Sequence, residues 1–200
     1  MKQGLTPYLL TLAPIVMFIA FMTGPDEVRD QDYLNWLKDQ SLTMMAGGTI
    51  VVTIGAVMMF GGWFVLTQDM MAKSNKTQQD LLMLSRVALI FPMVLLLLAT
   101  GIDMENWWVI DEGVDDYYTV EEEEAIVLNN HNVSSYIWGT MPITWAIGLI
   151  LIGVVALMDN KKDNHSAQWV FAGPVVTGLG LIGAYWFEPL WLFFMVAILI

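Results

Sequence analysis

Residues 101–135 read GIDMENWWVIDEGVDDYYTVEEEEAIVLNNHNVSS and lie between two long apolar runs. This stretch contains ten carboxylates and neither lysine nor arginine. In membrane proteins the cytoplasmic loops carry the excess of lysine and arginine. The stretch therefore predicts a small, ordered acidic loop over 102–135 on the extracytoplasmic side, and this assignment orients the rest of the chain.

The composition is that of an integral membrane protein embedded in a lipid bilayer. Hydrophobic residues make up 56% of the 200 residues and charged residues only 14%, whereas soluble domains carry about 25% charged residues. The absence of cysteine excludes disulfides and thiolate metal sites. The net charge of −12 excludes nucleic acid as a partner, because phosphate binding needs clustered lysine and arginine.

The apolar runs predict an all-α integral membrane fold with five transmembrane helices, over 5–23, 42–67, 81–101, 136–158 and 169–187. A signal peptide is the competing interpretation of the first run, but no A-x-A-like cleavage site precedes Pro25. Residues 190–200 are apolar to the last position and too few to cross a membrane. They predict a half-span buried in protein or a truncated sixth helix.

The basic residues support one orientation of the bundle. Six of the eight lie in segments that face the cytoplasm if the N-terminus is cytoplasmic and the acidic loops are extracytoplasmic. One of the six, Arg86, lies just inside the third span, where its guanidinium is expected to reach back to the headgroups. We expect the plasma membrane as the location.

Residues 24–40 precede the second span and contain five acids. The spacing of Val28, Tyr33, Leu34, Trp36 and Leu37 predicts a short interfacial helix with one apolar side. A solvated loop with an aromatic anchor is the alternative.

The acidic loop carries signals for local structure. Thr119 followed by Glu122 matches a capping box, which predicts a helix that begins there and ends near Asn129. The β-prone runs WWVI and DYYTV flank a turn at 111–113 and predict a small hairpin.

Asp111, Asp115 and Asp116 are candidate metal ligands in this loop. Carboxylate oxygens are the ligands that Ca²⁺ and Mg²⁺ prefer. Their spacing matches no calcium loop, and runs of acids are more often simply solvated. Binding of a divalent cation is the more specific hypothesis. The simpler one is a diffuse negative field that attracts cations without a defined site. No other cofactor is predicted.

Gly48, Gly55 and Gly62 recur every seven residues in the second span and predict a smooth face for helix packing. The frequent use of glycine in membrane helices is the alternative explanation. In the acidic loop, Asn132 begins an N-x-S sequon and is a candidate glycosylation site.

Catalytic signatures are missing from the sequence. His131 and His165, the two histidines, fall on opposite sides of the predicted membrane, and no H-E-x-x-H, G-x-S-x-G or phosphate-binding loop occurs. We therefore expect a non-catalytic subunit of a larger multi-subunit membrane complex, packing against other integral membrane subunits through its glycine faces and docking partners on the acidic loop. The alternative is a small cation transporter or channel with an acidic outer vestibule.

Overall fold

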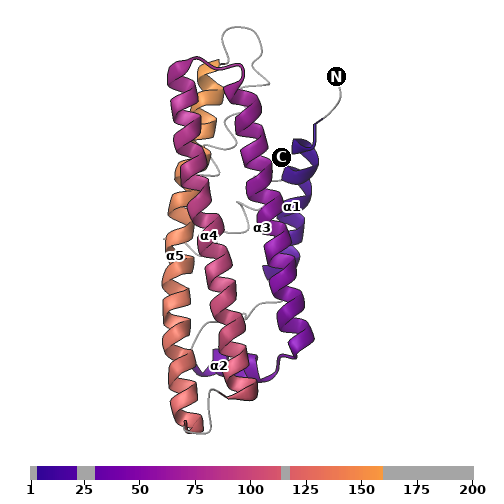
Figure 1. The fold of residues 1–200 in the computed structure, drawn as a ribbon, viewed down its shortest axis with the longest axis vertical. Coiled ribbons are helices and arrows are strands. Elements are labelled where there is room, and N and C mark those ends of the chain that lie inside the picture. Colours follow the sequence, from indigo (N-terminus) through magenta and orange to yellow (C-terminus); the bar gives the residue numbers. More distant parts are fainter. Residues whose placement is uncertain (1–3, 22–29, 114–117, 160–200) are drawn as a thin grey trace.

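The computed structural model describes residues 4–21, 30–113 and 118–159. In these ranges the chain forms five α-helices and no strand: α1 (Thr6–Phe21), α2 (Asp30–Lys38), α3 (Leu42–Met71), α4 (Lys76–Glu112) and α5 (Val120–Asp159). Four of them run along the molecule, and the short α2 lies across one end (Figure 1). The prediction of an all-α fold is confirmed for the described residues.

Three helices, α3, α4 and α5, are long and apolar enough to cross a membrane. They contain the predicted spans over 42–67, 81–101 and 136–158. Helix α1, in the first predicted span over 5–23, has 16 residues in the described part of the chain, fewer than the roughly 20 that cross the hydrocarbon core. The predicted span over 169–187 and the tail 190–200 lie outside the described residues. The structure thus indicates an integral membrane protein with three candidate spans.

The predicted acidic loop over 102–135 is mostly helical in the described residues. Helix α4 continues through the first acids to Glu112, and α5 already begins at Val120. Residues 107–110, predicted as one strand of a hairpin, lie in α4 instead. The reason is that Trp107, Val109 and Val127 are buried together with α2, so both helices have an apolar contact beyond the end of the membrane segment.

Local hydrogen bonds define where these helices begin. The predicted capping box is present: the Thr119 backbone N–H donates to Glu122 Oε2 (2.8 Å), and the Glu122 N–H donates to Thr119 Oγ1 (3.3 Å). A second capping box, between Asn75 and Gln78, starts α4. Helix α4 follows α3 after a turn of a few residues, so α3 and α4 are antiparallel neighbours.

The bundle has two chemically different ends. We call residues 30–41, 103–113 and 118–135 the acidic end, and residues 67–86 the Lys73 end. Helix α4 spans about 55 Å at 1.5 Å per residue and α5 about 60 Å, against about 30 Å for the hydrocarbon core. Both helices therefore project well beyond the apolar segment at the acidic end.

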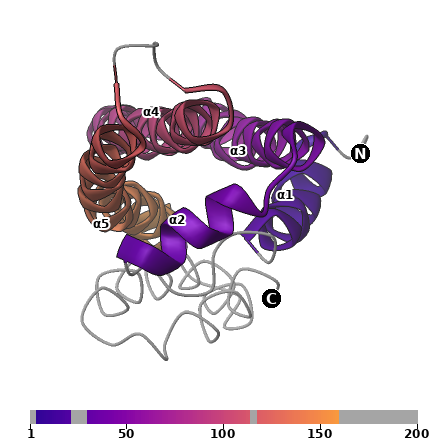
Figure 2. The ribbon, with the colours of Figure 1, turned by 90° about the horizontal axis from the view of Figure 1, so that it is seen from below.

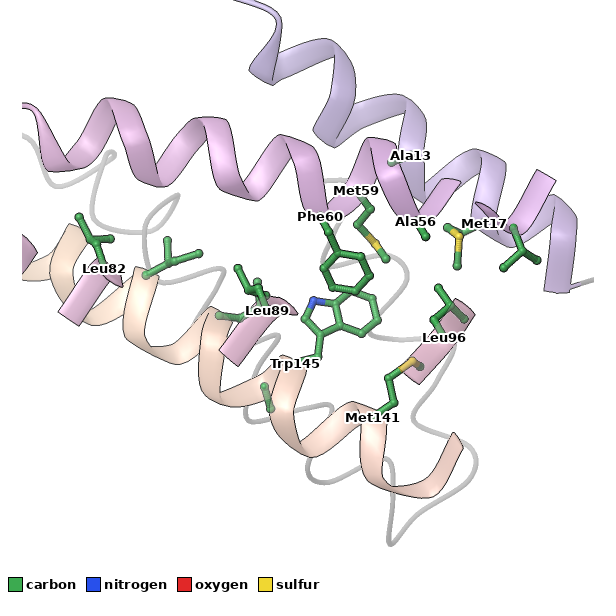
Figure 3. Packing of buried hydrophobic residues seen from close by; sticks show 14 of the residues in the cluster. Ala13, Met17, Ala56, Met59, Phe60, Leu82, Leu89, Leu96, Met141 and Trp145 are labelled. Atoms are coloured by element: carbon green, nitrogen blue, oxygen red, sulfur yellow. The ribbon is translucent and has the colours of Figure 1, made fainter. Parts of the chain in front are cut away.

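Helices α1, α3, α4 and α5 form an arc when seen along the bundle, and α2 crosses the space between α5 and α1 (Figure 2). The interior of the arc is apolar and contains buried residues from all four helices. Phe60 of α3 and Trp145 of α5 meet across it, with ring centroids 5.6 Å apart (Figure 3).

Glycines set the closest helix contacts. A Cβ atom added at Gly55 would lie 2.6 Å from Met17 Sδ, and one at Gly62 would lie 2.8 Å from Leu10 Cδ2. Both glycines thus lie against α1. Gly48, the third glycine of the predicted face, has no such neighbour within 4 Å.

Helices α4 and α5 make the largest helix contact of the described structure. At its centre the buried Ser85 hydroxyl donates to the Gly148 carbonyl at 2.8 Å. A Cβ at Gly148 would lie 2.7 Å from Leu89 Cγ, so only glycine permits this approach without a shift. Small residues with an interhelical hydrogen bond are the usual means of helix association in lipid.

Candidate functional site

The main candidate site lies at the acidic end, where α2 packs on α4 and α5. Helix α2 ends with Lys38 in its last turn, which suits the negative end of the helix dipole. Its Tyr33, Leu34 and Leu37 share one face and are each only 1% exposed. Because they contact Trp107 and Val127 and their neighbours rather than lipid, this face forms a second core separate from the one in the arc.

A hydrogen-bonded group of three side chains, which we call the tyrosine cluster, lies in this interface. The Tyr33 hydroxyl donates to Asp103 Oδ1 at 3.0 Å, and Asn106 Nδ2 donates to the Tyr33 hydroxyl at 3.0 Å. Asp103 and Asn106 are three residues apart and therefore lie on one face of α4. Tyr33 comes from α2, so the cluster joins two helices distant in sequence.

Helix α5 contributes His131 to the same place. Its ring stacks on that of Tyr33, with centroids 3.7 Å apart and planes at 23°. His131 and Ser134, one turn further along α5, are both buried. Asn106 Oδ1 and Ser134 Oγ are also buried and find no hydrogen-bond partner among the described residues. Such atoms are costly, so this interface is not optimised for stability alone.

The electrostatics of the cluster favour proton binding at Asp103. Asp103 lies beyond the apolar segment 81–101 of α4. Burial raises the pKa of its carboxyl to about 6, and the hydrogen bond from Tyr33 partly opposes this rise. Burial, followed by the neighbouring carboxylate, raises the pKa of the Tyr33 hydroxyl, which stays protonated. Asp103 can therefore gain or lose a proton within the physiological pH range while Tyr33 remains a donor.

Two further contacts fix α2 at its C-terminal end. The Trp107 indole N–H donates to the Gln40 carbonyl at 3.1 Å. Lys38 Nζ lies 2.6 Å from Glu124 Oε1 of α5, in a partly exposed ion pair. With the tyrosine cluster, these contacts connect α2 to both neighbouring helices.

The other predicted site residues lie elsewhere. Asp111 is exposed near the end of α4, while Asp115 and Asp116 lie outside the described residues. No group of three metal-binding side chains occurs within the described residues, and the metal site stays a prediction. Asn132 is exposed on α5, in a helix rather than in the predicted loop.

Arg86 has a more specific environment than the sequence predicted. Its Nε donates to Thr67 Oγ1 at 2.9 Å, and one terminal nitrogen donates to the Phe64 carbonyl and to Gln68 Oε1, at 3.0 and 2.7 Å. The guanidinium also lies 5.9 Å from the centre of the Phe64 ring. Arg86 therefore joins α4 to α3 at the Lys73 end.

Sequence reasoning missed the tyrosine cluster and Ser134. It treated residues 102–135 as a loop, in which helical spacing has no meaning. The usable signal was the spacing of Asp103 with Asn106 and of His131 with Ser134, each three residues apart and hence on one helical face.

Comparisons of this chain with models of protein families, with curated proteins and with solved structures found no match. Function is therefore inferred from the geometry of the chain itself.

Proposed function

We propose that this protein is a non-catalytic subunit of a larger membrane complex, which docks a partner with a basic surface on its acidic end. The observation that carries the proposal is the continuation of α4 and α5 past the membrane segment as paired helices. Helix α4 alone extends about 16 Å beyond residue 101 at 1.5 Å per residue. The acids are thereby held on a packed helical projection.

Several of these acids are exposed and available to a partner. Glu105, Asp111 and Glu112 on α4, and Glu121 and Glu122 on α5, are all exposed. Clustered charge of one sign steers a partner of opposite charge and fixes its orientation. We place this end on the extracytoplasmic side of the plasma membrane, because the lysines Lys73 and Lys76 lie at the other end.

The hydroxyls within the spans favour a subunit over the transport alternative. Thr53 donates to the Thr49 carbonyl and Thr144 to the Met141 carbonyl, each within its own helix. Thr67 likewise donates to carbonyls of α3. These hydroxyls are satisfied within their own helices, which favours a structural role over a transport role. A Cβ atom added at Gly47, Gly48 or Gly61 would meet nothing within 4 Å, so these glycines are available to a partner helix.

Purification from native membranes in mild detergent tests the proposal. We expect the tagged chain to carry partner proteins at a fixed ratio, measured by native mass spectrometry. In a variant with Asp111→Asn and Glu112→Gln, recovery of the partner should fall by about tenfold or more at physiological ionic strength, because charge attraction is lost. Raising the salt concentration should release the partner from the parent chain.

The matched control carries Asp69→Asn and Asp80→Asn, two exposed acids at the Lys73 end. It should retain the partner at the parent ratio. The proposal is wrong if the parent chain purifies alone, if both double variants behave alike, or if the purified chain by itself conducts cations in liposomes.

A further inference from the structure

Helix α2 bridges the two sides of the arc at the acidic end. In sequence it lies between α1 and α3, while in space it contacts α4 and α5. Figure 2 shows it crossing the space between α5 and α1. How tightly α2 binds to α4 and α5 therefore affects how the two sides are held together.

The contact between α2 and α4 contains a carboxyl group, that of Asp103, which is partly shielded from water. Asp103 receives one hydrogen bond, from Tyr33, and the amide of Asn106 on the other side of that hydroxyl carries no charge. A partly buried carboxylate with a neutral donor is poorly compensated for the water it has lost. Separating α2 from α4 would return this carboxylate to water.

We propose that Asp103 is a proton-binding site that controls how tightly α2 is held against α4 and α5. Protonation removes the partly desolvated charge and stabilises the docked α2. Deprotonation leaves a carboxylate that is better solvated when α2 is displaced, and so weakens docking. This inference is independent of the partner that the acidic end binds.

The sign follows from proton linkage. The docked form has a pKa of about 6 at Asp103, above the ordinary value of 3.8. Docking is therefore strongest below the ordinary value and weakens as the pH rises through about 6. A difference of about two pH units limits the change in the docking equilibrium to roughly a hundredfold.

Other titratable groups near the cluster can be distinguished from Asp103. On α2, Tyr33 keeps its proton in this pH range. On α5, His131 stacks on Tyr33, and its protonation would bring a positive charge into a buried site. The Asp103→Asn variant keeps His131 in place and therefore separates the two groups. The ion pair of Lys38 and Glu124 is partly exposed and joins α2 to α5 rather than to Asp103.

Spin labels on the full chain in lipid nanodiscs test the proposal directly. The chain has no cysteine, so Asn35→Cys on α2 and Asn132→Cys on α5, both exposed, give one labelled pair. We expect a single narrow distance distribution at pH 5 and a second, longer component at pH 8, with a midpoint near pH 6. Asp103→Asn, a neutral analogue of the protonated acid, should keep the narrow distribution at both pH values.

Two variants separate the explanations. Asp80→Asn removes an exposed acid of α4 at the Lys73 end, outside the proposed docking surface, and should leave the pH response unchanged. Tyr33→Phe retains the ring but removes the only hydrogen-bond donor to Asp103 among the described residues, so the longer component should grow at pH 8 and not at pH 5. A distance distribution independent of pH in the parent would overturn the proposal. Persistence of the pH response in Asp103→Asn would also overturn it, because His131 or the exposed glutamates would then be the sensor.

Discussion

The α4–α5 pair is held together differently in its two halves. Within the apolar segment, Gly148 lets the two backbones approach and Ser85 bonds across the contact, with only apolar neighbours. At the acidic end the same two helices need α2, whose Leu34 and Leu37 fill the second core. The difference reflects the solvent. In lipid, helices associate by close backbone packing. In water, apolar side chains are stable only when a further element covers them.

Enlarging Gly148 is the strongest way to break the apolar half. In Gly148→Leu, the new side chain would overlap Leu89 and approach the Ser85 carbonyl. We expect a loss of about 3 kcal/mol in the free energy of unfolding, measured by SDS titration in detergent micelles, since overpacking must separate the helices.

Gly101→Leu is the matched control on the same pair. Gly101 is exposed and has no atom within 4 Å of an added Cβ. Because leucine favours a helix over glycine, this variant should be as stable as the parent or slightly more so. Equal destabilisation by both variants would contradict the assignment of Gly148 to a close helix contact.

Shortening Leu37 tests whether the acidic end has an independent core. Leu37→Ala removes a fully buried side chain and should cost about 2 kcal/mol. The effect should appear as faster amide exchange in α2 and the adjoining parts of α4 and α5, and not at the turn between α3 and α4. Leu42→Ala, at an exposed leucine at the start of α3, should leave exchange in α2 unchanged. Faster exchange throughout the bundle would show that the two cores unfold as one.

The sequence was sufficient for the helices but not for their ends. Apolar runs located α3, α4 and α5, because about 20 apolar residues have few structures available in lipid. The capping box at Thr119 was also predicted correctly, since it depends on residues three positions apart. The C-terminal end of α4 and the start of α5 were missed because the acidic residues indicate a loop. Burial of Trp107 and Val127 instead continues both helices.

The candidate site was harder to predict for a related reason. Tyr33 lies 70 residues from Asp103 in the sequence, and nothing local indicates that the two meet. Arg86 illustrates the same limit. Its depth in the third span was evident, but its partners on α3 were not, because they depend on the angle at which α3 and α4 pack.

Arg86 joins α3 and α4 at the Lys73 end, much as the tyrosine cluster joins α2 and α4 at the acidic end. Arg86→Lys keeps the charge but cannot donate along both the Nε and terminal directions of a guanidinium. We expect a loss of about 1 kcal/mol, with the same SDS titration as the measurement. Thr67→Val removes one partner of Arg86. The double variant should therefore lose less than the sum of the two single losses, by about 0.5 kcal/mol or more. Strictly additive losses would mean that the contribution of Arg86 does not depend on its hydrogen bond to Thr67.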